Sequence, residues 1–311
     1  MRKSRRSVLA LACLLVLAGC TDAPAAPPAA LPSKAAVTSH QKPTPKAELQ
    51  LPRGGRQIFP DHQLVAFVGA PGSPALGPLN ADLDERAQRL EQTATSYSKD
   101  RRALPVMELI VVMAQGSAGR DGKYRSRIAA QQVDRYLAVA RKHKMLLVLG
   151  VQPGQAKPLT EIRRLDPWLR QPDVGLALDP EWEVGPDQVP GRVFGRTSGA
   201  ELNSIAAYLS TLVTTNHLPE KLFVFHQLSK PIVRNEAALR THPGIVTVKS
   251  VDGIGARTDK LDTYNRLITG LPKGIHTGFK LFYDEDTRHG PLMTPPQVLA
   301  IRPRPELVTY E

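Results

Sequence analysis

Residues 174–182, which read VGLALDPEW, decide the fold class of this chain. Side chains along a β-strand alternate between two faces, so Val174, Leu176 and Leu178 share one face and are expected to pack against helices. The opposite face then points into the interior of a barrel. That face carries small residues first and two carboxylates last: Gly175, Ala177, Asp179 and Glu181.

Similar apolar runs recur on both sides of this segment and are separated by longer amphipathic segments. Strand–helix alternation of this kind predicts a parallel sheet with helical crossovers. Eight runs favour a closed (β/α)8 barrel of the TIM type, in which the last strand pairs with the first. The expected strands are 64–68, 107–114, 145–152, 174–181, 221–228, 244–251, 275–283 and 307–310.

The segments between these strands have helical patterns. Pro167 is expected to break the third helix, and Ser198 or Thr197 to cap the fourth. An open doubly wound sheet is the alternative fold, but residues 69–72 lack the glycine spacing of a phosphate-binding turn. The expected helices are 84–97, 128–143, 159–169, 200–216, 235–240, 259–268 and 296–301.

The N-terminus has the pattern of a secretory leader. A basic start is followed by an apolar run over 8–16, which is too short to cross a bilayer as a helix. The run ends in Leu17-Ala18-Gly19-Cys20, which resembles the lipobox of bacterial lipoproteins. The resemblance implies cleavage before Cys20, lipidation of Cys20, and a chain held on the extracytoplasmic face of the cell membrane. We therefore predict a lipoprotein signal peptide over 1–19.

Residues 20–60 are rich in Ala, Pro, Ser and Lys and hold few large apolar side chains. Such a composition predicts a disordered tether, which leaves 61–311 as one barrel domain. Removal of the leader, with four basic residues and no acidic one, lowers the formal net charge from +12 to +8. A basic domain near a membrane favours acidic lipids or wall polymers. Nucleic acid is not an expected partner, because aromatic residues are few and no basic–aromatic repeat occurs.

Polar side chains follow several of the predicted strands at their C-terminal ends. Active sites of such barrels lie at that end, so these residues are the candidate site. Trp182 is added as a candidate platform for stacking a sugar ring. The polar residues at the strand ends are Gln115, Gln152, Asp179 with Glu181, His226 with Gln227, Lys249 with Asp252, and Asp284 with Glu285.

Asp179 and Glu181 are the most informative pair. Positions two apart on a strand place their Cα atoms roughly 6.5–7 Å from each other, so the two carboxylates repel and one retains a proton. A protonated carboxylic acid near neutral pH is the group that glycosidic cleavage needs.

The stretch Leu178-Asp179-Pro180-Glu181-Trp182 resembles the fourth-strand Asp-x-Glu motif of several barrel glycosidases. It is similar to the Leu-Asp-x-Glu stretch of the lysozyme-type family 25 hydrolases and to the end of the family 18 chitinase signature, although Ala177 stands where that signature has an acid. The resemblance implies that Glu181 is the general acid and Asp179 its assisting partner, acting on a cell-wall polysaccharide. The whole domain also resembles uncharacterised actinobacterial envelope lipoproteins.

Several alternatives remain at this stage. If Lys280 and Asp284 point inward from the seventh strand, Glu181 acts as acid/base and Asp284 or Glu285 as nucleophile, as in a large clan of retaining glycosidases. Asp179 can instead form a structural ion pair with Lys249 or Lys280. A non-catalytic glycan-binding lipoprotein is the rival function. No cofactor and no metal are predicted, but a metal-dependent hydrolase is the third possibility. Its ligands would come from Asp179, Glu181, His226, Asp252 and Asp284.

Overall fold

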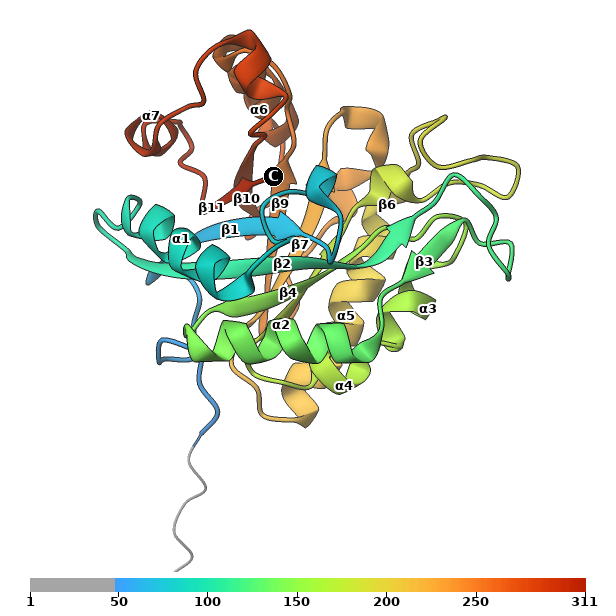
Figure 1. Cartoon of the computed structure of the whole chain (residues 1–311), viewed down its shortest axis with the longest axis horizontal. Helices are drawn as coiled ribbons and strands as arrows, with labels where there is room; N and C mark the ends of the chain where they lie inside the picture. The colour runs from blue at the N-terminus through green and yellow to red at the C-terminus, as the bar shows by residue number, and fades with distance from the viewer. Residues whose placement is uncertain (1–47) are drawn as a thin grey trace, which may run out of the picture. The chain divides into compact units, whose positions relative to one another are not determined.

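The computed structural model describes residues 48–311, and eight parallel strands close into a barrel (Figure 1). The order is β1-β11-β10-β9-β7-β5-β4-β2, and pairing between β1 and β2 completes the circle. This confirms the predicted (β/α)8 fold and all eight predicted strands. The strands are β1 (His62–Gly69), β2 (Arg102–Ala114), β4 (Leu146–Val151), β5 (Val174–Leu178), β7 (Lys221–Gln227), β9 (Ile245–Val251), β10 (His276–Leu281) and β11 (Leu307–Tyr310).

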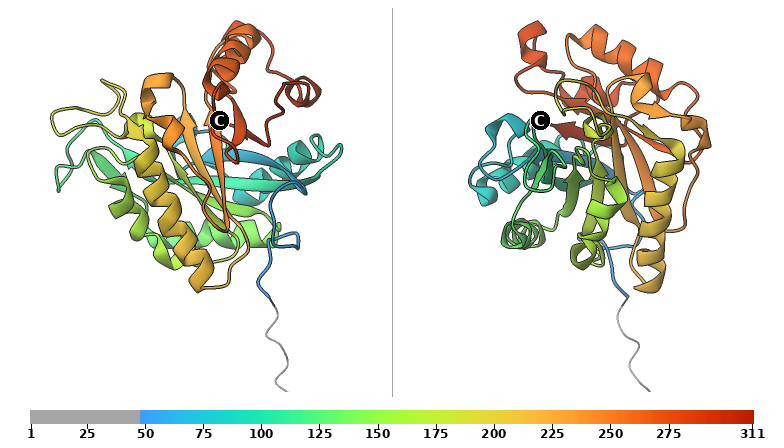
Figure 2. Two further views of the ribbon diagram at one scale, coloured as in Figure 1. Left: turned by 180° about the vertical axis from the view of Figure 1, so that it is seen from behind. Right: turned by 90° about the vertical axis from the view of Figure 1, so that its right-hand side faces the viewer.

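Helices cover the outside of the barrel, as the two views of Figure 2 show. The predicted break in the third helix is confirmed, because the segment forms two short helices with Pro167 in the first turn of the second. Ser198 caps the longest helix by accepting a hydrogen bond from the backbone N–H of Glu201. The helices are α1 (Leu83–Thr95), α2 (Ala130–Lys142), α3 (Pro158–Arg163), α4 (Asp166–Leu169), α5 (Gly199–Thr215), α6 (Arg257–Ile268) and α7 (Pro295–Leu299).

The predicted helix over 235–240 is wrong. The segment forms one 3₁₀ turn, η4 (Glu236–Ala238), because Asn235 before it has a left-handed backbone with φ of +49° and Leu239 after it is extended with ψ of 141°. Sequence patterns also missed short strands of two or three residues: β3 (Arg125–Arg127), which runs antiparallel to β2, and the parallel pair β6 (Thr197–Ser198) and β8 (Val233–Arg234). The other 3₁₀ turns are η1 (Pro74–Leu76), η2 (Pro180–Trp182), η3 (Lys230–Ile232) and η5 (Asp286–His289).

The core has two large parts, one between strands and helices and one in the barrel lumen, and a small third cluster of Val68, Ala70 and Ile110. As predicted, Val174, Leu176 and Leu178 of β5 belong to the outer part, whereas Ala177 belongs to the luminal part. Gly175 is needed on the luminal face, because a Cβ there would lie 2.8 Å from the carbonyl oxygen of Leu222 in β7. Small residues on β5 therefore bring its backbone close to its neighbour.

The lumen is closed at its lower end by residues that precede β1. Leu51 and Ile58 are buried in the luminal cluster, beside apolar side chains of β1, β2 and β7. The backbone N–H of Ile58 also donates to the Glu220 carboxylate at 2.6 Å. The barrel domain therefore begins earlier than the predicted boundary at residue 61. The predicted signal peptide, Cys20 and most of the predicted tether lie outside the described residues.

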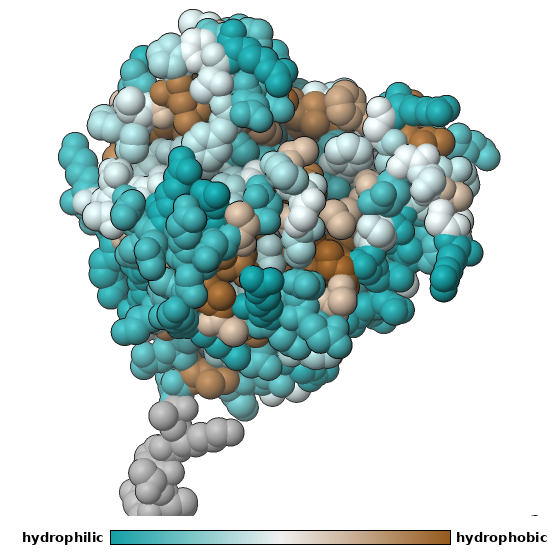
Figure 3. Space-filling view, viewed as in Figure 1, coloured by the Kyte–Doolittle hydropathy of each residue, from teal (hydrophilic) through white to brown (hydrophobic). Residues whose placement is uncertain are grey.

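Within residues 48–311, no helix combines the length and apolar character that a membrane crossing requires. On the face drawn in Figure 3, hydrophilic side chains predominate and apolar ones form separate small patches.

Candidate functional site

The C-terminal end of β5 places Asp179 and Glu181 at the top of the lumen. Asp179 directly follows the strand, and its side chain accepts a hydrogen bond from Gln152 Nε2 at 3.1 Å. Gln152 is itself fixed, since its Oε1 accepts from the backbone N–H of Ala114 at 3.2 Å. β5 ends at Leu178, so Glu181 lies on the 3₁₀ turn η2 rather than on the strand. Both acids nevertheless line one cavity, as the alternation of small and acidic residues predicted.

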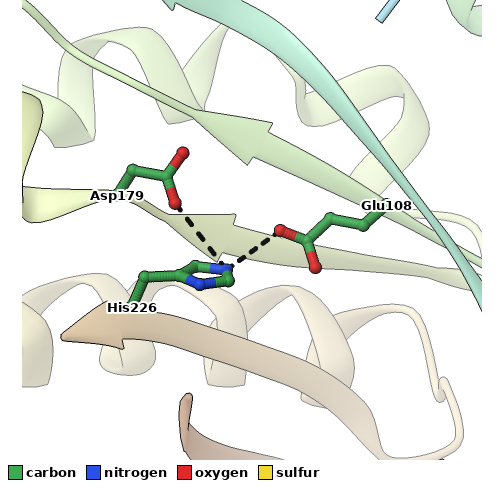
Figure 4. A group of neighbouring side chains, drawn as sticks. All are labelled: Glu108, Asp179 and His226. Carbon is green, nitrogen blue, oxygen red and sulfur yellow. Dashed lines mark hydrogen bonds and ion pairs between the residues drawn. The ribbon is translucent and has the colours of Figure 1, made fainter. Parts of the chain in front are cut away.

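His226 of β7 lies at the centre of this end of the barrel (Figure 4). Its Nε2 is 2.9 Å from Glu108 Oε1 and 3.7 Å from Asp179 Oδ1. Its Nδ1 is 2.8 Å from Asp252 Oδ2. Burial opposes a charge on the ring, but the carboxylates of Asp252 and Glu108 outweigh burial and raise the pKa of His226 well above its usual value. We conclude that His226 is an imidazolium with both N–H groups donated to carboxylates.

Lys280 of β10 supplies the second buried cation. Its Nζ lies 3.1 Å from Asp252 Oδ2 and 2.6 Å from Glu311 Oε2. Despite burial, these carboxylates hold the pKa of Lys280 well above its usual value. Asp252 also accepts from the Ser250 hydroxyl at 2.8 Å, and despite burial its pKa falls because His226 and Lys280 lie beside it.

Glu181 differs from the paired acids in this network. Its Oε2 is shielded from solvent and has no hydrogen-bond partner. Burial, together with the nearby Asp179 and Asp252 carboxylates, raises the pKa of Glu181 well above its usual value. Burial also raises the pKa of Asp179, but His226 and Lys280 oppose that rise. Of the two acids, Glu181 is therefore the one more strongly held in its protonated form.

The acids of this network and Lys280 line a cavity of about 400 Å³ at the mouth of the barrel, whereas His226 is fully buried and does not line it. Its lower wall is polar and its rim is apolar, with Trp182, Phe282 and two strongly exposed residues, Phe194 at 64% and Ile254 at 55%. An apolar rim above convergent polar groups is typical of a small-molecule or sugar site.

Three of the residues predicted at the strand ends bond other parts of the chain instead of lining this cavity. Lys249 points outward from β9, where its Nζ bonds Glu236 and the carbonyl oxygen of Leu267 in α6. Gln227 also points outward and donates to backbone carbonyls of the next turn. Gln115 bonds the Ser126 hydroxyl at 3.0 Å beside β3. In the first two cases strand alternation explains the correction, because the neighbours His226 and Ser250 occupy the inward positions.

The predicted inward position of Asp284 is also wrong. Lys280 faces the lumen as expected, but β10 ends at Leu281 and the chain then turns, which leaves Asp284 exposed. Glu285 follows on the same turn, and neither acid lines the cavity. The third acid of this run, Asp286, is buried in an ion pair with Lys260 at 2.8 Å. The arrangement with Asp284 or Glu285 as nucleophile therefore has no support from these positions.

Sequence reasoning missed Glu108, Ser250 and Glu311. Glu108 lies in the middle of the 13-residue strand β2, not at its end. Glu108 is a charged residue inside an apolar run, and it continues the inward-facing row of Leu104 and Val106. These two features would have identified Glu108 from the sequence. Glu311 directly follows β11, and the same rule of strand ends applies to it.

One group of side chains in residues 48–311 has the spacing of a metal site. Ligand atoms of Glu108, Asp179 and His226 all lie within 4.8 Å of one another. A histidine binds a metal through a neutral ring nitrogen, whereas both nitrogens of His226 already donate to carboxylates. A metal would therefore fit these donors only if His226 loses its Nε2 proton and its hydrogen bond to Glu108 is broken.

Comparison with known proteins adds little beyond the fold. No protein-family model matches the chain, and no curated protein matches it. A solved structure described as a hyperthermophilic endo-β-1,4-glucanase in complex with substrate aligns with a TM-score of 0.38 at 8% identity, over 73% of this chain and 81% of the other.

Proposed function

We propose that this protein is a glycoside-hydrolase-like enzyme of the cell envelope that cleaves a wall polysaccharide by general acid catalysis. The observation that carries the proposal is Glu181 Oε2, a shielded carboxyl oxygen without a partner, whose pKa is raised by burial and by the nearby Asp179 carboxyl. An unpartnered buried carboxyl is costly for stability, so its retention favours a role in binding or chemistry.

In the proposed reaction, the Glu181 carboxyl donates its proton to the glycosidic oxygen and the bond from that oxygen to the anomeric carbon breaks. Asp179, held as a carboxylate by His226 and Gln152, stabilises the positive charge that develops on the sugar ring. Water then adds its hydroxyl to the anomeric carbon, and its remaining proton returns to Glu181. Trp182 and Phe194 offer apolar surfaces for the faces of the sugar rings.

The test is release of reducing ends from fractionated wall polysaccharides by the purified chain. Glu181→Gln keeps the size of the side chain but cannot donate the proton, so turnover should fall at least 100-fold while the thermal midpoint does not fall. Glu285→Gln is the matched control, since this glutamate lies on the loop after β10, outside the cavity. Full turnover in Glu181→Gln would remove Glu181 from the mechanism. Binding without turnover in the unaltered chain would favour a glycan-binding protein.

A metal-dependent hydrolase is the second candidate, favoured by the spacing of Glu108, Asp179 and His226. It predicts that a chelator abolishes hydrolysis and that Zn²⁺ or Mn²⁺ restores it. Acid catalysis by Glu181 alone predicts full activity in chelator. The same assay therefore separates the two reactions.

The proposed location is the extracytoplasmic face of the membrane, through a lipid on Cys20. Its support is the sequence Leu17-Ala18-Gly19-Cys20 after a basic and apolar leader. Labelled fatty acid should be incorporated into the unaltered chain, and the labelled chain should be found in the membrane fraction of the cells. Cys20→Ser should abolish the labelling.

A further inference from the structure

A second recess adjoins the cavity on the other side of Glu181. It measures about 140 Å³ and shares three wall residues with the larger cavity: Glu181, Trp182 and Phe194. Its remaining lining comes from the loop that precedes β6, over residues 191–193. The acid carboxyl therefore lies on the wall between two hollows.

The loop is held rigidly against the acid. The backbone N–H of Arg192 donates to the carbonyl oxygen of Val189 at 3.1 Å, with Pro190 and Gly191 between them. Gly191 has φ of +81°, so these four residues match a type II turn, which favours proline second and glycine third. Arg192 is thus placed by a turn whose sequence specifies its geometry.

A second contact ties the same loop to η2. The backbone N–H of Gly195 donates to the carbonyl oxygen of Glu181 at 2.6 Å. A Cβ at Gly195 would lie 2.2 Å from the carbonyl oxygen of Glu183, so only glycine allows this approach. The recess is therefore formed before any ligand arrives, which reduces the entropic cost of binding.

The cations of the two hollows differ in their partners. Lys280 in the larger cavity bonds Asp252 and Glu311, so its charge is neutralised. Within residues 48–311, the Arg192 guanidinium has no carboxylate within ion-pair distance, and its residue is exposed. A guanidinium recognises a carboxylate through paired N–H donors. Val193 and Phe194 beside it, exposed at 41% and 64%, supply apolar contact for a sugar ring.

We propose that the recess at Arg192 is a binding site for an acidic sugar, one that carries a carboxylate, while an uncharged sugar occupies the larger cavity. The substrate class is therefore an anionic polysaccharide whose chain crosses the wall formed by Glu181 and Trp182. Acidic groups lining the larger cavity would repel a carboxylate there, whereas Arg192 attracts one in the recess. The inference deepens the proposed function and rests on it, because it takes the ligand to be a polysaccharide that passes Glu181.

The experiment measures calorimetric binding of two hexasaccharides that differ only in charge: β-1,4-linked glucose, and the same chain with alternate units oxidised to glucuronate. Binding is measured in Glu181→Gln, so that turnover plays no part. The carboxylated chain should bind at least tenfold more tightly at low salt, with a preference that shrinks as salt rises. Arg192→Gln in that background should lower the ratio to about one. Arg196→Gln is the matched control, an exposed arginine of the same loop that does not line the recess, and should keep the preference.

Equal binding of the two chains, binding of neither, or an equal loss in Arg196→Gln would overturn the proposal. Failure of the proposed function gives a different result, in which the charge preference persists but no wall polysaccharide is cleaved. Cleavage with no charge preference would refute the acidic-sugar site and leave the hydrolase proposal in place.

Discussion

Glu108 and His226 meet in the barrel lumen, with Oε1 and Nε2 separated by 2.9 Å, and this contact sets the charge of the whole site. Because Asp252 takes the other ring nitrogen at 2.8 Å, the imidazolium cannot rotate or give up a proton cheaply. Its charge reaches Asp179, at 3.7 Å, and favours the carboxylate form of that residue. Glu108, in the middle of β2, thus supports the cation that favours the carboxylate form of Asp179, the residue after β5.

The first prediction concerns the ionisation of His226. At pH 7.5 both ring nitrogens should be protonated, because Asp252 and Glu108 raise the pKa of His226 well above its usual value. Its contribution to stability is full below the unfolded pKa of about 6.5 and is lost only as pH rises through the folded pKa. Long-range ¹H–¹⁵N NMR of the histidine rings checks this directly. A neutral ring at pH 7.5 would contradict the network.

Glu108→Gln tests the same hydrogen-bond network by mutation. It removes one of the two carboxylates, so the pKa of His226 should fall, and unfolding free energy should fall by about 1–3 kcal/mol at pH 7. Glu48→Gln is the control, because that side chain is exposed and its distance to Arg56 is 3.8 Å. It should leave both quantities unchanged.

The second prediction concerns the loss of stability as pH rises from 5 to 8. Burial and the neighbouring Glu201 carboxylate raise the pKa of Glu183 to about 9. The folded chain therefore keeps a proton that the unfolded chain releases above its ordinary pKa, so stability falls as pH rises between those two values. In that window the loss is at most about 1.4 kcal/mol per pH unit. Glu183→Gln should flatten the decline between pH 5 and pH 8, measured by urea unfolding. Parallel profiles for the two chains would refute the assignment.

The third prediction tests why β5 has small residues on its luminal face. Gly175→Ala would place a Cβ 2.8 Å from the carbonyl oxygen of Leu222, so the strands must shift and unfolding free energy should fall by about 1–3 kcal/mol. Gly116→Ala is the matched control, since its Cβ meets nothing within 4 Å and no positive φ is required. Equal urea midpoints for the two variants would show that the close approach is unimportant.

The sequence was sufficient for the barrel and for half of the site. Period-two alternation placed Asp179 and Lys280 correctly, because strands buried on both faces keep their register over several residues. His226 was found by its place at the C-terminal end of a strand. The search for polar residues at strand ends also selected Lys249 and Gln227, which occupy the outward positions next to Ser250 and His226. Knowing which end residue continues the inward row would have excluded both.

Other features required contacts between distant parts of the chain. The partner of His226 lies 118 residues earlier, and the partners of Lys280 come from two other strand ends. Asp284 was misplaced because no local signal marks where β10 stops. The fold of the loop before β6 is locally encoded by Pro190 and Gly191, but its position beside Glu181 is not.

The last prediction concerns the start of the domain. Composition alone places the boundary at residue 61, because Leu51, Ile58 and Phe59 are few apolar residues among polar residues, glycines and prolines. In the structure both side chains close the lower end of the lumen, and Ile58 is fully buried. Ile58→Ala should therefore cost about 2–5 kcal/mol, the usual cost of truncating a buried isoleucine. Leu49→Ala is the control, since Leu49 is 41% exposed and should change stability by less than about 0.5 kcal/mol.

A chain that begins at residue 61 should be markedly less stable in urea than one that begins at residue 48. Equal midpoints for these two chains would mean that the segment merely covers a barrel that is stable without it.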